Sequence, residues 1–217
     1  MEYIGSSPLL GGVLAVTPVD VPFSSQFELA DLSWARRGCA IACTTMVLNY
    51  FGRQVRVSEV LEAALARGGF DPVRGWLHSR LVEVLQAHGL AAYRRNWRLL
   101  DGRECAYLAG REPGPAARTE LGLVRAQMLA EGMWSIATLL GARVPVIVST
   151  YRPTGDRSSV GHQLVLVAWE GPDLVYRDPA LEAGAYLHMP SEAFRANWKG
   201  TAIVAHDGAP RLNPSTG

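Results

Sequence analysis

Three residues of this chain, Cys39, His162 and Asp178, have the types and the order along the sequence that catalysis by a thiol nucleophile requires. Cys39 opens the apolar segment CAIACTTMVLNYF, which Gly52 follows and which we expect to form a buried helix. A cysteine in the first turn of a helix faces backbone N–H dipoles, and these lower the pKa of its thiol. The position therefore suits a thiolate nucleophile, and the alternative is a small residue of the core.

A thiol nucleophile needs an imidazole to accept its proton and a third group to fix the tautomer of that ring. His162 follows Gly161 at the start of a predicted strand, and Asp178 precedes Pro179 at the end of the next one. A hairpin brings these strand ends together, so the Asp178 carboxylate could accept a hydrogen bond from the His162 ring. The alternatives are a loop histidine and an ordinary Asp-Pro turn.

Acyl transfer also needs hydrogen-bond donors for the oxyanion, commonly a backbone N–H at the nucleophile and a side-chain amide. Gln26, in the segment VPFSSQ, is the candidate amide, and its alternative is a polar loop residue. Cys43 lies one helical turn beyond Cys39, and we expect it to be enclosed and inert. The histidines lack His-x-x-x-His spacing and no Gly-rich phosphate loop occurs, so we expect no metal ion and no cofactor.

The elements that must position these residues form a helical first part and a β-rich second part. We expect helices over 39–51, 58–67, 77–88, 120–140 and 191–198, and strands over 144–151, 162–169, 174–177 and 201–206. The turn Glu170-Gly171-Pro172-Asp173 joins two strands of an antiparallel meander. This order predicts an α+β fold, and the length predicts one domain over 1–217.

Three segments rich in Pro, Gly and Ser are expected to be irregular. They are a lead-in over 1–20, a loop or insertion over 98–118 and a flexible tail over 208–217. Within the lead-in and just beyond it, residues 14–21 could pair with an edge of the sheet.

Composition narrows the choice of partners and location. The 217 residues include 48% hydrophobic ones and carry a formal net charge of +1, as in an ordinary globular domain. The basic residues are scattered arginines with one lysine, Lys199, so nucleic acid is not expected as a partner. No apolar run reaches the ~20 residues of a membrane-spanning helix.

Cysteine usage and the N-terminal residues indicate a cytoplasmic protein. Cys39, Cys43 and Cys105 are an odd set in a chain large enough to fold without disulfides, which favours reduced thiols. No Lys or Arg precedes the apolar residues 8–16, whereas a signal peptide would carry one there. No pattern indicates an oligomeric state.

Several stretches resemble one family. GCAIACTTMVLNYFG resembles the nucleophile helix of the bacteriocin-processing, papain-like cysteine peptidases of the C39-like family, and GHQLVLVAWEGPDLVYRDP is similar to their histidine strand, hairpin and Asp-Pro strand. VPFSSQ, PVIVSTY and FRANWKGTAIV also resemble segments of that family, and together the matches cover about half of the chain. The resemblance implies a papain-like cysteine proteinase fold with Cys39 as nucleophile, His162 as base, Asp178 as orienting acid and Gln26 in the oxyanion hole.

Two positions depart from the family pattern. Ala40 and Ile41 follow the nucleophile where Gly-Pro or Gly-Ala is common, and Arg177 stands before Asp178 where Asn is common. A bulkier turn after Cys39 would alter the oxyanion hole, and the arginine would change the hydrogen bonding around the base.

The resemblance implies a stand-alone cysteine peptidase or amide hydrolase that acts on a peptide or amide substrate through a thioester. Transporter-fused members of the family trim leader peptides after a double glycine, but this chain shows neither a membrane helix nor a P-loop. One alternative is an acyl or aminoacyl transferase in a biosynthetic pathway, which resolves the same thioester with an amine. The other is a catalytically silent peptide-binding module. Because all the expected polar residues are present, an enzyme is favoured.

Overall fold

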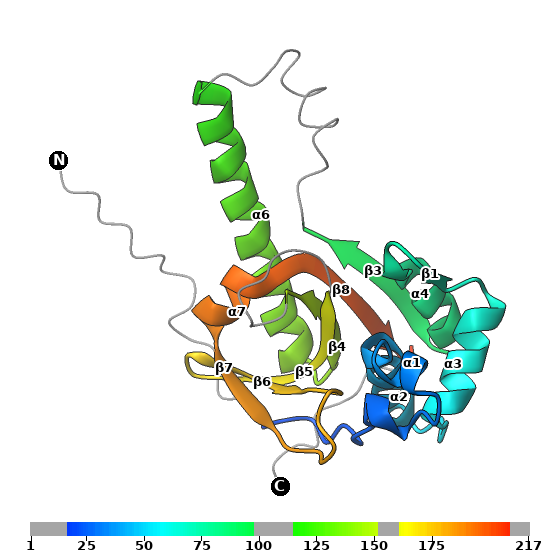
Figure 1. The fold of residues 1–217 in the computed structure, drawn as a ribbon. Helices are drawn as coiled ribbons and strands as arrows, with labels where there is room; N and C mark the ends of the chain where they lie inside the picture. Colours follow the sequence, from blue (N-terminus) through cyan, green and yellow to red (C-terminus); the bar gives the residue numbers. More distant parts are fainter. Residues whose placement is uncertain (1–16, 98–114, 152–160, 209–217) are drawn as a thin grey trace, which may run out of the picture.

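The computed structural model describes residues 17–97, 115–151 and 161–208, and Figure 1 shows how they fold. The helices are η1 (Gln26–Glu28), α1 (Leu32–Ala35), α2 (Cys39–Tyr50), α3 (Val57–Ala66), α4 (His78–Ala87), α6 (Pro115–Gly141) and α7 (Ser191–Asn197). The strands are β1 (Phe70–Asp71), β2 (Gly75–Trp76), β3 (Ala91–Asn96), β4 (Val146–Thr150), β5 (His162–Glu170), β6 (Asp173–Arg177), β7 (Leu187–Pro190) and β8 (Trp198–His206). Within these ranges no helix is long and apolar enough to cross a membrane.

Six of the strands form one antiparallel sheet in the order β3-β8-β4-β5-β6-β7. The meander expected from the sequence is present as β4 to β7, and β8 lies between β3 and β4. Glu170 pairs with Asp173 across the predicted tight turn, where Gly171 has a φ of +58° that a side chain would strain. The short β1–β2 hairpin stands apart from the sheet.

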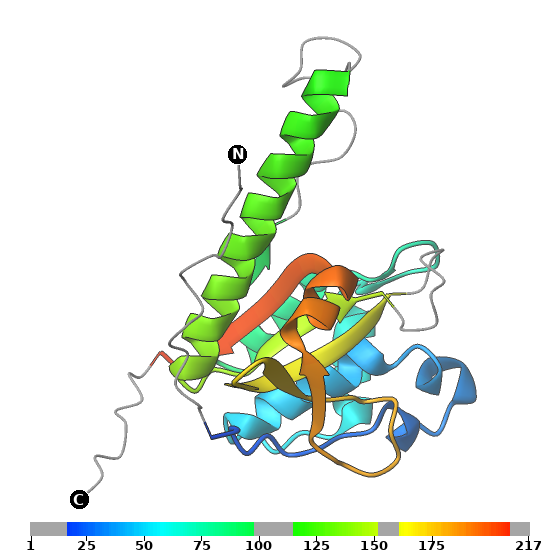
Figure 2. The ribbon, with the colours of Figure 1, turned by 90° about the vertical axis from the view of Figure 1, so that its left-hand side faces the viewer.

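Helices cover both faces of the sheet (Figures 1 and 2). Val165 and Val167 of β5 belong to the core shared with α2, α3 and α4, whereas Leu164 and Leu166 belong to the core shared with α6 and α7. Successive side chains of a strand point to opposite faces, so a strand covered on both sides is apolar throughout. The sandwiched sheet and its two helical layers confirm the α+β fold class.

Helix α2 is enclosed by the rest of the domain. All its residues from Ala40 to Leu48 are buried, including Thr44 and Thr45. The hydroxyl groups of these threonines donate to the carbonyl groups of Ala40 and Ile41, at 2.8 and 3.0 Å. Because their polar atoms are satisfied within the helix, α2 can pass through the core and present its first residue at a fixed place.

Some element ends differ from the sequence-based expectation. Helix α3 begins at Val57 rather than at residue 58, because the Glu59 carboxylate accepts the Arg56 N–H at 2.7 Å and closes a capping box. Helix α6 begins at Pro115, so residues 115–118 of the predicted loop are helical. The rest of that loop, residues 98–114, lies outside the described residues.

The lead-in segment joins the sheet at an interior position. The N–H of Val19 donates to the carbonyl group of Val167 at 3.1 Å. Val167 lies where the pairing of β5 with β6 shifts its register, so its carbonyl group is turned out of the ladder. In the described part of the predicted pairing segment, residues 17–21, Val19 thus contacts a bulge in a central strand and not an edge strand. Residues 1–16 and 209–217 lie outside the described residues.

Gly132 of α6 allows the helix to approach two tryptophans. A Cβ atom at this position would lie 2.5 Å from Cη2 of Trp198 and 2.9 Å from Cδ2 of Trp97. Both rings are buried. We expect Gly132→Ala to lower the free energy of unfolding by about 1–3 kcal/mol, because packed rings cannot give way.

Gly122→Ala is the matched control, since nothing lies within 4 Å of a Cβ at Gly122 on the exposed part of the same helix. This change should leave the stability unchanged or raise it by up to ~1 kcal/mol, because alanine favours helix more than glycine does. Urea unfolding of both variants measures the difference. Equal effects of the two substitutions would contradict the close packing at Gly132.

Candidate active site

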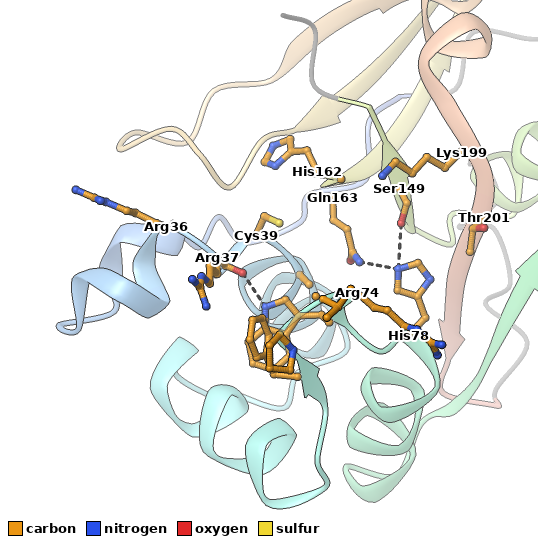
Figure 3. Close-up of a pocket in the computed structure, with 17 residues that line it drawn as sticks. Arg36, Arg37, Cys39, Arg74, His78, Ser149, His162, Gln163, Lys199 and Thr201 are labelled. Carbon is orange, nitrogen blue, oxygen red and sulfur yellow. Dashed lines mark hydrogen bonds between the residues drawn. The ribbon is translucent and has the colours of Figure 1, made fainter. Parts of the chain in front are cut away.

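Cys39 is the first residue of α2 and is half-buried at a cleft (Figure 3). The preceding residue, Gly38, allows a close approach, because a Cβ there would lie 3.0 Å from Leu29 Cδ1 and 3.2 Å from Gln26 Cβ. Backbone N–H groups of Ala40 and Gln163 hydrogen-bond the Cys39 sulfur and favour its anionic form. The thiol thus lies at the positive end of a helix, as the sequence predicts.

The structure brings His162 and Asp178 together, with His162 Nε2 2.7 Å from Asp178 Oδ1. His162 is the first residue of β5 and Asp178 directly follows β6, so the hairpin places them at the same end of the sheet. Asp178 Oδ1 also accepts the N–H of Ala180 at 2.9 Å, which fixes the carboxylate. The other ring nitrogen, Nδ1, is buried and has no partner at standard hydrogen-bond distance and angle in the described part of the chain. The ring still interacts with the Cys39 thiol.

The electrostatics of the three groups favour a proton on the imidazole rather than on the sulfur. Burial is the largest single influence and would raise the pKa of the Cys39 thiol, but the hydrogen bond and charge of His162, together with the backbone N–H groups of Gln163 and Ala40, lower it. Burial by itself would lower the pKa of His162, but its hydrogen bonds with Asp178 and Cys39 and their negative charges raise it to about 9. The pair therefore has the character of a thiolate and an imidazolium.

Gln26 lies beside Gly38, the residue before Cys39, but does not line the cleft. Its side-chain Nε2 donates to the carbonyl group of Ala35 at 2.8 Å, and its backbone N–H donates to the carbonyl group of Pro179 at 2.9 Å. The residue is only 2% exposed, and its Oε1 has no hydrogen-bond partner within the described residues. The first bond fixes the side-chain amide on the segment before Cys39, and the second fixes the Gln26 backbone on the segment after Asp178.

The cleft next to Cys39 has a volume of about 460 Å³. Its walls come from the α1–α2 junction, the β1–β2 hairpin, the first residue of α4 and the ends of β4, β5 and β8. The described residues hold no group of three or more His, Cys, Asp or Glu side chains that could bind a metal ion. Cys39 and His162 both line the cleft, so a thiol and an imidazole face the same space.

An aromatic cluster fixes the hairpin wall of the cleft. The rings of Trp34, Phe70 and Trp76 pack with centroid separations of 5.1, 5.7 and 5.2 Å. The indole N–H of Trp76 donates to the carbonyl group of Arg37 at 2.7 Å. These contacts attach the hairpin to the residues just before Cys39, so the wall and the thiol are positioned together.

Sequence reasoning missed a second polar cluster in the same cleft. The Nε2 atom of His78 lies 2.9 Å from Gln163 Nε2 and 3.1 Å from Ser149 Oγ (Figure 3). Burial, followed by the charges of Arg94 and Lys199, lowers the pKa of His78 to about 4, so its ring is neutral at pH 7. The one local signal for this cluster was that Gln163 directly follows His162 in the sequence, at the strand end that lines the cleft.

The two departures from the family pattern, Ala40-Ile41 and Arg177, do not block the cleft. Ile41 is fully buried in α2 and does not line the cleft, whereas the backbone N–H of Ala40 hydrogen-bonds the Cys39 sulfur. The guanidinium of Arg177 lies over the ring of Tyr186, 3.7 Å from its centroid. Cys43 is fully buried, and burial raises its pKa well above the usual value, so it is enclosed as expected.

Several solved structures resemble this chain. A C39-like peptidase from Bacillus anthracis is 18% identical, with a TM-score of 0.53 over 89% of this chain and 98% of that chain. A double glycine motif protease from an AMS/PCAT transporter, solved with the leader peptide, is 17% identical, with a TM-score of 0.48 over 88% of this chain and 96% of that chain. The peptidase domain of Streptococcus ComA, a bi-functional ABC transporter, is 16% identical, with a TM-score of 0.48 over 78% and 91% of the respective chains. The comparison with curated proteins gave no match.

At such identities the likeness concerns the fold, which is the papain-like cysteine proteinase fold expected from the sequence. The family evidence is separate and covers most of the chain. The model of the Peptidase_C39 like family matches residues 18–206, a range that contains η1, α2 and the complete six-stranded sheet. This chain therefore belongs to the Peptidase_C39 like family.

Proposed function

We propose that the protein is a cysteine peptidase or amide hydrolase in which Cys39 is the nucleophile, His162 the general base and acid, and Asp178 the residue that orients the imidazole. The observation that carries the proposal is the His162 ring, which is 2.7 Å from Asp178 Oδ1 and interacts with a thiol at the start of α2. This arrangement raises the pKa of His162 to about 9 and lowers the pKa of Cys39. Family membership supports the same class of chemistry.

In this mechanism the Cys39 thiolate attacks the carbonyl carbon of the substrate amide and forms a tetrahedral intermediate with negative charge on oxygen. The Cys39 N–H donates a hydrogen bond to that oxygen. The second N–H of Gln26 Nε2 is the proposed further donor, which requires the buried amide to turn toward the cleft. When the C–N bond breaks, the His162 imidazolium gives its proton to the leaving amine and a thioester remains. Neutral His162 then takes a proton from water, which hydrolyses the thioester and releases a carboxylic acid and the Cys39 sulfur.

The proposal is tested by incubating a defined peptide library with wild type, Cys39→Ala and Gln26→Ala and identifying new termini by mass spectrometry. We expect products from the wild type and none from Cys39→Ala. In Gln26→Ala we expect kcat to fall by about 10²–10³-fold, as when an oxyanion donor is removed. Alkylation of Cys39 by iodoacetamide should continue at the wild-type rate in this variant, because Gln26 acts on the oxyanion and not on the thiol.

The products of the same experiment separate the alternatives. Free carboxylic acids identify hydrolysis, whereas products joined to an added amine would identify acyl transfer. Peptide binding without any Cys39-dependent product would overturn the enzymatic proposal and identify a peptide-binding module.

A further inference from the structure

The cleft beside Cys39 has a strongly basic lining. Arg36 and Arg37 come from the α1–α2 junction, Arg74 from the β1–β2 turn and Lys199 from β8. No Asp or Glu occurs among the lining residues in the described ranges. Since the whole chain has a formal net charge of only +1, positive charge is concentrated at this cleft.

The aromatic hairpin wall presents two of these arginines. The guanidinium of Arg37 lies 5.5 Å from the centroid of the Phe70 ring, and its backbone carbonyl group is bonded to Trp76. Arg74 lies on the β1–β2 turn, where the Asp71 carboxylate accepts the N–H of Arg74 at 2.9 Å. Contact with the Phe70 ring restricts the Arg37 side chain before any ligand binds. A guanidinium can then bind a carboxylate through two parallel hydrogen bonds.

Both guanidinium groups are open to a ligand. Arg37 and Arg74 are exposed, and neither forms an ion pair with a carboxylate in the described part of the chain. The nearest acid along the chain, Asp71, uses its Oδ1 to bind the N–H groups of Val73 and Arg74 in the turn. These backbone hydrogen bonds and, less strongly, the charge of Arg74 lower the pKa of Asp71, so this carboxylate offsets part of that charge, but no ion pair closes off either guanidinium in the described residues. The cleft thus combines two accessible cations with an adjacent thiol.

We propose that this cleft binds a carboxylate group of the substrate next to the scissile bond, through Arg37 and Arg74. The inference rests on the proposed function, because the ligand is the substrate of the Cys39 site. The carboxylate belongs either to an Asp or Glu side chain or to the C-terminus of the peptide. The His162 imidazolium adds to the same positive field.

The test compares two reagents of nearly equal size, iodoacetate and iodoacetamide, in which the Cys39 thiolate displaces iodide. Rates are measured at low ionic strength for wild type, Arg37→Gln, Arg74→Gln and Arg125→Gln. The last variant is the charge-matched control, because Arg125 is exposed on α6 and does not line the cleft. We expect each cleft variant to slow iodoacetate by about 3-fold, the effect of one unit charge several ångström away in water, and to leave iodoacetamide unchanged.

High salt should remove most of this difference, and Arg125→Gln should change neither rate. Equal rates with iodoacetate in all variants, or equal losses with both reagents, would overturn the inference. A failure of the proposed function appears differently, as slow reaction of wild-type Cys39 with both reagents. The ratio of the two rates still reports the charge of the cleft in that case.

Paired peptides then identify the source of the carboxylate. One pair differs by Glu or Gln near the cleavage site, and the other has a free or an amidated C-terminus. We expect the wild type to prefer the acidic member of one pair and the R37Q/R74Q double variant to lose about 10-fold of that kcat/KM preference, the product of the two single losses. An equal preference in wild type and double variant would contradict binding through these arginines.

Discussion

Replacing His162 with alanine is expected to slow alkylation of Cys39 by iodoacetamide at pH 7 by about 30-fold or more. Without the imidazolium, an ordinary thiol with a pKa of about 8.5 is only ~3% thiolate at this pH. The loss should exceed this value, because burial is the largest influence on Cys39 and raises its pKa once the opposing hydrogen bond and charge of His162 are absent. Intact mass and peptide mapping after limiting labelling measure the rate and the site.

The pH dependence provides a second readout of the same change. In the wild type the rate should stay high through neutral pH, whereas in His162→Ala it should rise steadily toward alkaline pH as the thiol ionises. Cys43→Ala is the matched control and should react at the wild-type rate, because Cys43 is fully buried and its pKa is raised. Labelling that is indifferent to His162, or that prefers another cysteine, would overturn the catalytic role of Cys39.

Replacing Asp178 with alanine is expected to destabilise the fold in a pH-dependent way. The folded state raises the pKa of His162 from 6.5 to about 9, so it binds the proton more tightly than the unfolded chain does. The resulting stabilisation is fully present below pH 6.5 and is lost as the pH rises through 9. A shift of this size corresponds to on the order of 3 kcal/mol, which Asp178 shares with Cys39.

Asp178→Ala should therefore lower the free energy of unfolding by on the order of 1–3 kcal/mol at pH 6 and by much less at pH 9.5, as urea unfolding measures. Asp178→Asn is the conservative control, because the amide keeps an acceptor for His162 Nε2 but removes the charge. We expect this variant to retain more of the iodoacetamide reactivity of Cys39 than Asp178→Ala does. A loss of stability that is equal at both pH values would contradict the coupling between Asp178 and the His162 proton.

Much of the candidate site could be predicted because its placement depends on short stretches of chain. The apolar segment from Cys39 to Phe51 ends at Gly52, so the sequence itself determined a buried helix with a thiol in its first turn. The tight turn between β5 and β6 likewise determined that His162 and Asp178 meet. Local hydrogen bonding and side-chain periodicity are encoded in neighbouring residues, which is why these features were accessible from the sequence.

The edges of the sheet could not be predicted in the same way. Strand β3 runs along one edge, and only Ala92 among its residues is buried. Strand β7 forms the other edge and has no buried residue. An edge strand that buries few side chains carries no apolar alternation, so its existence depends on backbone pairing with a neighbour already in place.

The lining of the cleft was decided by the tertiary structure alone. Arg37, Arg74, His78 and Gln163 come from the α1–α2 junction, the β1–β2 turn, α4 and β5, and no spacing in the sequence connects them. They converge because the aromatic cluster fixes the hairpin against the segment before Cys39 and because α2, which begins at Cys39, packs on β5. The sequence thus determined the reactive groups through local rules, whereas long-range packing decided the charge and shape of the site that surrounds them.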